Sequence, residues 1–166
     1  MKTLFLIIHT SFLISLLNSN SNAQTPQCQW ANTSLLVNSN TSSCYANSVA
    51  TDSYGNVYVV GNFSDSIVTF GSITLKTKKN SVAMFIVKYD ANGNALWAKS
   101  DAGYGSSATA VTIDKFNNIY VVGYFSSSFT FNSQTYVSNG YCEIFTIKYD
   151  MDGNVIWINS AGGANT

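Results

Sequence analysis

The stretch DSYGNVYVVGNF at residues 52–63 returns, with few changes, as DKFNNIYVVGYF at residues 114–125. A second pair follows, with IVKYDANGNALWAKS at residues 86–100 and TIKYDMDGNVIWINS at residues 146–160. The first pair is offset by 62 positions and the second by 60, so the later copy lacks two residues in its middle. Self-similarity at a fixed spacing is typical of repeat architectures. The chain therefore contains two copies of one structural unit.

Each unit has the pattern of four β-strands. In NVYVVGNF successive side chains alternate between two faces, and both faces are apolar, which predicts a strand covered on both sides. The stretches NSVATD, MFIVKYD and ALWAKS supply the other three strands of the first unit, and no 3.6-residue period follows the first 23 residues. The sequence predicts an all-β fold in which two four-stranded antiparallel sheets, the blades of an incomplete β-propeller, pack face to face.

The expected organisation has four parts. Residues 1–23 form a leader and residues 24–45 an N-terminal segment, followed by one repeat at 46–100 and another at 101–166. Because Trp30 and Ala31 resemble the WA pair of the fourth strand, we expect an additional strand near Trp30.

Aspartate and glycine recur where two strands join. Aspartate side chains accept backbone N–H bonds in such turns, and glycine adopts a positive φ without strain. In the second unit Asn118 follows Asn117 instead of a glycine, and asparagine is the next best residue at left-handed φ. The expected turn residues are Asp52, Gly55, Asp90, Gly93, Asp114, Asn118, Asp150 and Gly153.

The first 23 residues have the layout of a secretory signal peptide. A basic start at Lys2 precedes the apolar run LFLIIHTSFLISLL, and small residues lead to a cleavage site after Ala23. The apolar run is short for a membrane span, so we expect a secreted or cell-surface protein without a span after cleavage.

Charge and composition exclude several functions for residues 24–166. The chain has no arginine, and Lys2 and the only histidine, His9, leave with the leader. The absence of a basic patch gives no basis for nucleic-acid binding, and the absence of histidine excludes histidine-based triads and imidazole metal ligands.

Three cysteines remain in an oxidising compartment. Cys28 and Cys44 close a short loop and are either a disulfide or two buried thiols. Cys142 has no obvious mate in the chain, which suggests an intermolecular partner or further sequence.

The acidic residues give no catalytic pair. Aspartates that recur in both units fit turns, and nothing pairs the unmatched Asp65, Asp101, Glu143 and Asp152 as acid and base. Asp150, Asp152 and Asn154 resemble the opening of a calcium loop, but the bidentate acid that would complete it is missing, and a hairpin turn explains the same letters. We expect no catalytic residue, cofactor or metal.

Aromatic residues are the candidates for ligand contact. Trp97 and Trp157 recur at equivalent positions, which favours core packing. Tyr104, Tyr136 and Tyr141 have no counterpart in the other unit and are the expected exposed contacts.

The motifs DSYGNVYVVGNF, TFGS and FIVKYDANGNALWAKS, with their second copies, resemble the SBBP beta-propeller repeat over residues 46–160. The resemblance implies blades of a roughly seven-bladed propeller, in exported and surface proteins of Bacteroidota-type bacteria that often carry adhesion modules, and it brings no catalytic motif. Residues 24–166 contain two of these units, and we expect the chain to be a fragment, or the start, of a longer protein.

The expected function is a non-enzymatic module for binding, adhesion or spacing, whose ligand is a protein or a carbohydrate. The alternative is part of a propeller-type carbohydrate-active enzyme whose active groups lie in other blades. Since two blades leave two apolar faces uncovered, we expect further blades or self-association.

Overall fold

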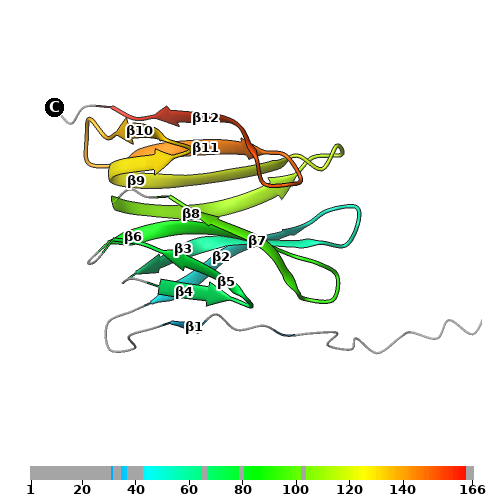
Figure 1. Ribbon diagram of the computed structural model, residues 1–166. Helices are drawn as coiled ribbons and strands as arrows, with labels where there is room; N and C mark the ends of the chain where they lie inside the picture. Colours follow the sequence, from blue (N-terminus) through cyan, green and yellow to red (C-terminus); the bar gives the residue numbers. More distant parts are fainter. Residues whose placement is uncertain are drawn as a thin grey trace, which may run out of the picture.

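The computed structural model describes residues 31, 35–36, 43–64, 67–78, 81–101 and 104–163. Every regular element in these ranges is a β-strand (Figure 1), which confirms the all-β expectation. The leader at residues 1–23 and the strand expected near Trp30 lie outside the described residues.

The first blade is a four-stranded antiparallel sheet with the strand order β2-β3-β6-β7. Its strands are β2 (Cys44–Thr51), β3 (Val57–Ser64), β6 (Val82–Tyr89) and β7 (Ala95–Ser100). These are the four strands expected from the first repeat, joined in sequence order.

The second blade repeats this order and gains a fifth strand. It contains β8 (Tyr104–Ile113), β9 (Ile119–Phe131), β11 (Glu143–Tyr149) and β12 (Val155–Ala161), and β10 (Gln134–Val137) pairs with the far end of β9. The four strands expected for this sheet are therefore correct, and the prediction lacked the fifth strand, β10.

A short hairpin in the first unit was not expected from the sequence. β4 (Ile67–Phe70) and β5 (Ile73–Lys76) pair with each other, and β1 (Leu35–Leu36) adds to β4. The second unit places one residue fewer between Phe125 and Phe131 than the first unit places between Phe63 and Phe70. Where the first unit forms the two strands β3 and β4, the second unit therefore forms the single strand β9.

The two blades pack face to face through one continuous core. β8 lies against β2, β3 and β6 of the first blade, as Figure 1 shows. The core joins Tyr58, Val60, Met84 and Ile86 of the first blade to apolar side chains of the second, including Val121, Phe125, Phe129, Phe145 and Ile147. Each fully buried side chain of this kind contributes about 1.5–3 kcal/mol, so this shared core dominates the packing of one blade on the other.

A second core covers the opposite face of the first blade. The hairpin β4–β5 contributes Val68, Phe70 and Leu75, and these pack with Phe63 and Phe85 of the sheet. The ring centroids of Phe70 and Phe85 are 4.9 Å apart. The hairpin therefore shields part of a face that the sheet alone would leave open.

Two glycines allow the first and second strands of each blade to approach closely. A Cβ atom at Gly61 would collide with the backbone oxygen of Tyr45, and one at Gly123 would collide with the backbone oxygen of Ser107. Both positions lie beside a register shift, between Ala46 and Ser48 in β2 and between Ala108 and Ala110 in β8. Only a residue without a side chain fits there.

Candidate functional site: the aspartate turns and their exposed aromatic residues

Four tight turns, each beginning with an aspartate, share one hydrogen-bond pattern. At Asp114, Oδ1 accepts bonds from the backbone N–H groups of Phe116 and Asn118 at 2.8 and 2.9 Å, and Oδ2 accepts one from Asn118 Nδ2 at 2.8 Å. The same three bonds recur at Asp52, Asp90 and Asp150. Each carboxylate is therefore engaged by donors of its own turn.

These bonds stabilise the charged form of the aspartates. The side-chain bond from Asn118 is the largest cause that lowers the pKa of Asp114 to about 2. Burial by itself raises the pKa of Asp52, but bonds from Asn56, Tyr58 and Tyr54 bring it below its ordinary value. The pKa values of Asp90 and Asp150 are lowered by the same kind of bonding. All four carboxylates are thus charged at neutral pH and are poor proton donors.

The fourth residue of each turn adopts a positive φ. The values are 82° at Gly55, 85° at Gly93, 81° at Gly153 and 62° at Asn117. The left-handed position in the second unit is therefore Asn117, and Asn118 instead occupies the place of Asn56. Asn118 is still a turn residue, because its side chain donates to Asp114.

The Asp150 turn does not suit a calcium ion. Both oxygens of Asp150 accept N–H donors, whose positive ends occupy the directions that a cation would need. Among the described residues no group of three or more histidine, cysteine, aspartate or glutamate side chains could hold a metal ion. Asp150, Asp152 and Asn154 form a turn of the same type as the other three.

The unmatched acids occupy separate places. Asp101 is buried between the blades, where Oδ1 accepts bonds from Ser106 Oγ at 2.6 Å and from the backbone N of Met84 at 3.1 Å. Glu143 is buried in β11 and accepts a bond from the backbone N of Asn139 at 2.8 Å. Asp65 lies outside the described residues. Asp152, the third unmatched acid that the structure describes, lies in the Asp150 turn. The three acids therefore lie on three different elements.

The three tyrosines expected as ligand contacts do not form one site. Tyr141 is almost fully exposed, and Tyr104 is exposed beneath the ammonium of Lys78, which lies 4.5 Å from its ring centroid. Tyr136 is half-buried, packs against Phe129 and directs its hydroxyl to the backbone oxygen of Ile158. The expectation that Tyr136 is an exposed contact is therefore wrong, because its ring completes the core beside β10.

Two exposed aromatic residues were missed from the sequence. Tyr54 and Phe116 hold equivalent positions at the third place of the first turn in each blade, with exposed fractions of 67% and 74%. The backbone N and the Oγ of Ser53 both donate to Asn117 Oδ1, at 3.3 and 3.1 Å, so the two turns are bonded to each other. The sequence signal that could have found them is an aromatic residue at the same place of the first turn in both units.

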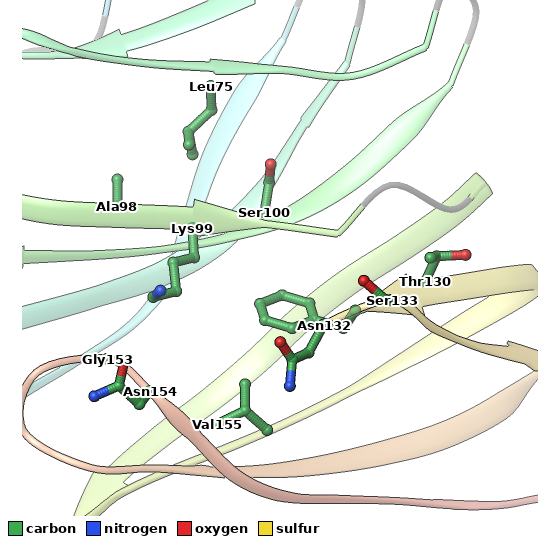
Figure 2. A pocket seen from close by; sticks show the side chains of 11 residues that line it. Leu75, Ala98, Lys99, Ser100, Thr130, Asn132, Ser133, Gly153, Asn154 and Val155 are labelled. Atoms are coloured by element: carbon green, nitrogen blue, oxygen red, sulfur yellow. The ribbon is translucent and has the colours of Figure 1, made fainter.

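A cleft of about 700 Å³ opens between the two blades. It lies between β7 and two turns of the second blade, and Figure 2 shows Lys99 above Asn132, Asn154 and Val155. Lys99 is the one charged side chain among its lining residues. The cleft therefore offers polar contacts without a pair of titratable groups for acid–base chemistry.

The cysteines are only partly described. Cys28 lies outside the described residues, so the pairing of Cys28 with Cys44 stays a prediction. Cys142 is exposed just before β11.

Two stacked blades built from one repeated unit define the fold class of this protein, an incomplete β-propeller. Residues 32–62 match the family SBBP, described as a beta-propeller repeat, and this match confirms the resemblance expected from the sequence. The matched segment covers β1, β2 and most of β3.

A relative shares the repeat character. The chain is 30% identical over 125 residues to the "Uncharacterized WD repeat-containing protein L264" of Acanthamoeba polyphaga mimivirus. That alignment covers 66% of this chain and 9% of the viral protein. Within the part of the chain that the structure describes, no helix has the length and apolarity to cross a membrane.

Proposed function

We propose that the chain is a non-enzymatic, protein-binding module of an exported or cell-surface protein. The observation that carries the proposal is the pair Tyr54 and Phe116, two large aromatic side chains that are exposed at equivalent turns of neighbouring blades. Propeller repeats and the WD-repeat relative are consistent with an interaction or structural role.

The turn itself does not need an aromatic residue at this position. Asn92 and Asp152 occupy the same third place in the Asp90 and Asp150 turns, which have the same hydrogen bonds. Tyr54 and Phe116 also bury little surface, so they add little to folding. Exposed aromatic side chains without a structural role are typical of interface anchors.

The turns present these rings on a rigid support. Each aspartate fixes its turn by three bonds, and the bonds from Ser53 to Asn117 join the two turns. A preorganised surface loses less conformational entropy on binding, which supports a binding role for this end of the blades.

The described carboxylates favour binding over catalysis. The four recurring aspartates are bonded within their turns, and Asp101 and Glu143 are buried in separate places. A propeller-type carbohydrate-active enzyme, the alternative function, would need a carboxylate pair that these residues do not provide.

Export is supported by the leader sequence at residues 1–23. Secretion would place the module where partners at a cell surface are accessible.

The test replaces each aromatic residue by a residue that stands at the third place of another turn in this chain. A phage-displayed random peptide library is selected on the wild-type protein, and the enriched peptides are measured on Tyr54→Asn and Phe116→Asp by biolayer interferometry. We expect each substitution to weaken binding about tenfold or more, as for interface anchors. Tyr141→Asn tests the exposed tyrosine that the sequence suggested as a ligand contact, and affinity should be unchanged if the binding surface lies at the turns.

Three results would contradict the proposal: equal affinity for the wild-type and turn variants, loss of binding only in Tyr141→Asn, or binding confined to an immobilised glycan array. The last would replace the protein partner by a carbohydrate.

A further inference from the structure

One face of the second blade carries the same group of a tyrosine, a tryptophan and a lysine that the first blade buries. Between the blades, the rings of Tyr58 and Trp97 meet edge to face at 6.0 Å, and Lys88 Nζ lies 5.3 Å from the Tyr58 ring. On the second blade Tyr120 and Trp157 meet edge to face at 6.2 Å, and Lys148 Nζ lies 5.2 Å from the Tyr120 ring.

This second face is open where the first is covered. Met84 and Val60 are fully buried, whereas Ile144 and Val122, which hold the same places in the second blade, are 60% and 40% exposed. Tyr124 and Trp157 are exposed beside them. The result is an apolar face, hereafter the outer face, formed by Tyr120, Val122, Tyr124, Ile144 and Trp157.

The covered face shows what kind of partner fits. The first strand of the next blade, β8, packs on it and buries Val111 and Ser107. The equivalent strand of the first blade is β2, where Val49 and Tyr45 hold the same places and are 62% and 60% exposed. The chain therefore carries both halves of a second interface, on opposite sides of the molecule.

We propose that a second copy of this chain docks its β2 strand on the outer face, in the way that β8 docks on the first blade. The contact joins two different surfaces, so it is a head-to-tail contact. It involves other residues than the turn aromatics, and it stands whether or not the chain binds a further protein.

On both open surfaces, the residues differ from their counterparts at the internal interface, and the two sets of differences match each other. At the internal interface Ser107 Oγ donates to Asn62 Oδ1 at 3.0 Å, and Asn47 Nδ2 donates to the backbone oxygen of Ala108 at 2.8 Å. At the open surfaces Tyr124 stands in place of Asn62 and Tyr45 in place of Ser107. An amide–hydroxyl pair has thus become a pair of tyrosines, which can stack in the docked arrangement.

A second polar contact of the internal interface is also replaced by less polar residues on the open surfaces. Ser106 Oγ binds the buried carboxylate of Asp101 across the internal interface. The equivalent residue of Asp101 at the outer face is Ala161, and that of Ser106 in β2 is Cys44. Both open surfaces are therefore less polar than the surfaces of the internal interface, so β2 suits the outer face of its own chain.

Repetition of one head-to-tail contact closes a ring when the rotation allows it. Propellers contain 4–8 blades, so about two to four two-bladed copies would complete one ring.

The oligomeric state tests the proposal directly. Sedimentation velocity and light scattering of the purified chain should show a closed oligomer. Val49→Lys and Ile144→Lys place a charge on one open surface each, and both should give folded monomers that still unfold in a cooperative transition.

Val137→Lys is the matched control. Val137 is as exposed as Val49, at 62%, but lies in β10, where the first unit carries Lys76 at the equivalent position. This variant should assemble like the wild type.

Mixing the two lysine variants separates this arrangement from others. Each variant keeps one intact surface, so equal amounts of Val49→Lys and Ile144→Lys should form a one-to-one dimer. A symmetric contact between two outer faces predicts instead that Val49→Lys still dimerises by itself and that the mixture contains no dimer of the two variants. That result, or a wild-type monomer at all concentrations, would overturn the proposal.

Discussion

The hydroxyl of Tyr58 donates a buried hydrogen bond to Oδ2 of Asp52 at 3.0 Å, and Tyr120 repeats this bond to Asp114 at 3.2 Å. Tyr58 is fully buried between the blades, whereas Tyr120 is half-buried on the outer face. One contact therefore occurs in two environments within the same molecule, which allows the effect of burial on its strength to be measured.

Tyr58→Phe should lower the free energy of unfolding by about 1.5–3 kcal/mol, because it removes a buried hydrogen bond to a charged group. Tyr120→Phe should cost less, since water can replace the lost donor. Both are measured by urea denaturation in the Val49→Lys background, which keeps the outer face open. Equal losses would show that burial does not govern the strength of this bond.

Acid should destabilise the protein through its aspartate turns. Carboxylates with a lowered folded pKa contribute stability above the unfolded pKa and lose it as pH falls towards the folded value. The free energy of unfolding should therefore decrease between about pH 4 and pH 2. Asp114→Asn, whose amide does not titrate there, should have a flatter pH dependence and approach the wild type near pH 2, where Asp114 itself has its pKa. Parallel curves for the two proteins would contradict the assignment.

Gly123→Ala should disrupt the pairing of β8 with β9. The new methyl group would meet the Ser107 backbone and lie 2.8 Å from Phe145 Cε1, in the core. We expect a loss of about 2–3 kcal/mol, as for overpacked cores, in denaturant unfolding. Gly163→Ala is the control, because nothing lies within 4 Å of a Cβ there. Similar losses in both variants would argue against a close approach at Gly123.

Secretion should remove the leader. N-terminal sequencing of protein from the culture medium or cell surface should begin near Gln24, after the small residues that end at Ala23. An intact Met1 on protein retained in the cytoplasm would refute export.

The strands of both blades could be predicted because alternation and repetition agree with each other along 52–63 and 114–125. The hairpin β4–β5 could not, since its two strands have four residues each and the second unit continues the same segment as part of β9. Tyr136 was misplaced for a related reason: its burial depends on β10, a strand whose existence the pattern does not indicate.

The same residue at equivalent positions of the two units can also have different surroundings, which the sequence does not reveal. Trp97 packs against the shared core, whereas Trp157, predicted to pack in the same way, is 37% exposed. The difference arises from the neighbouring blade, which covers one tryptophan and not the other. Local sequence determines the ring position in its sheet, but only the packing of whole blades determines its exposure.

Asp101 lies at the passage from β7 to β8 and accepts bonds from Met84 in one blade and Ser106 in the next. Opening either strand would leave this buried carboxylate short of donors, so fraying of one blade penalises the other. The two blades should therefore behave as a single cooperative foldon, in which hydrogen exchange gives one common free energy of opening for the amides of β6 and β8.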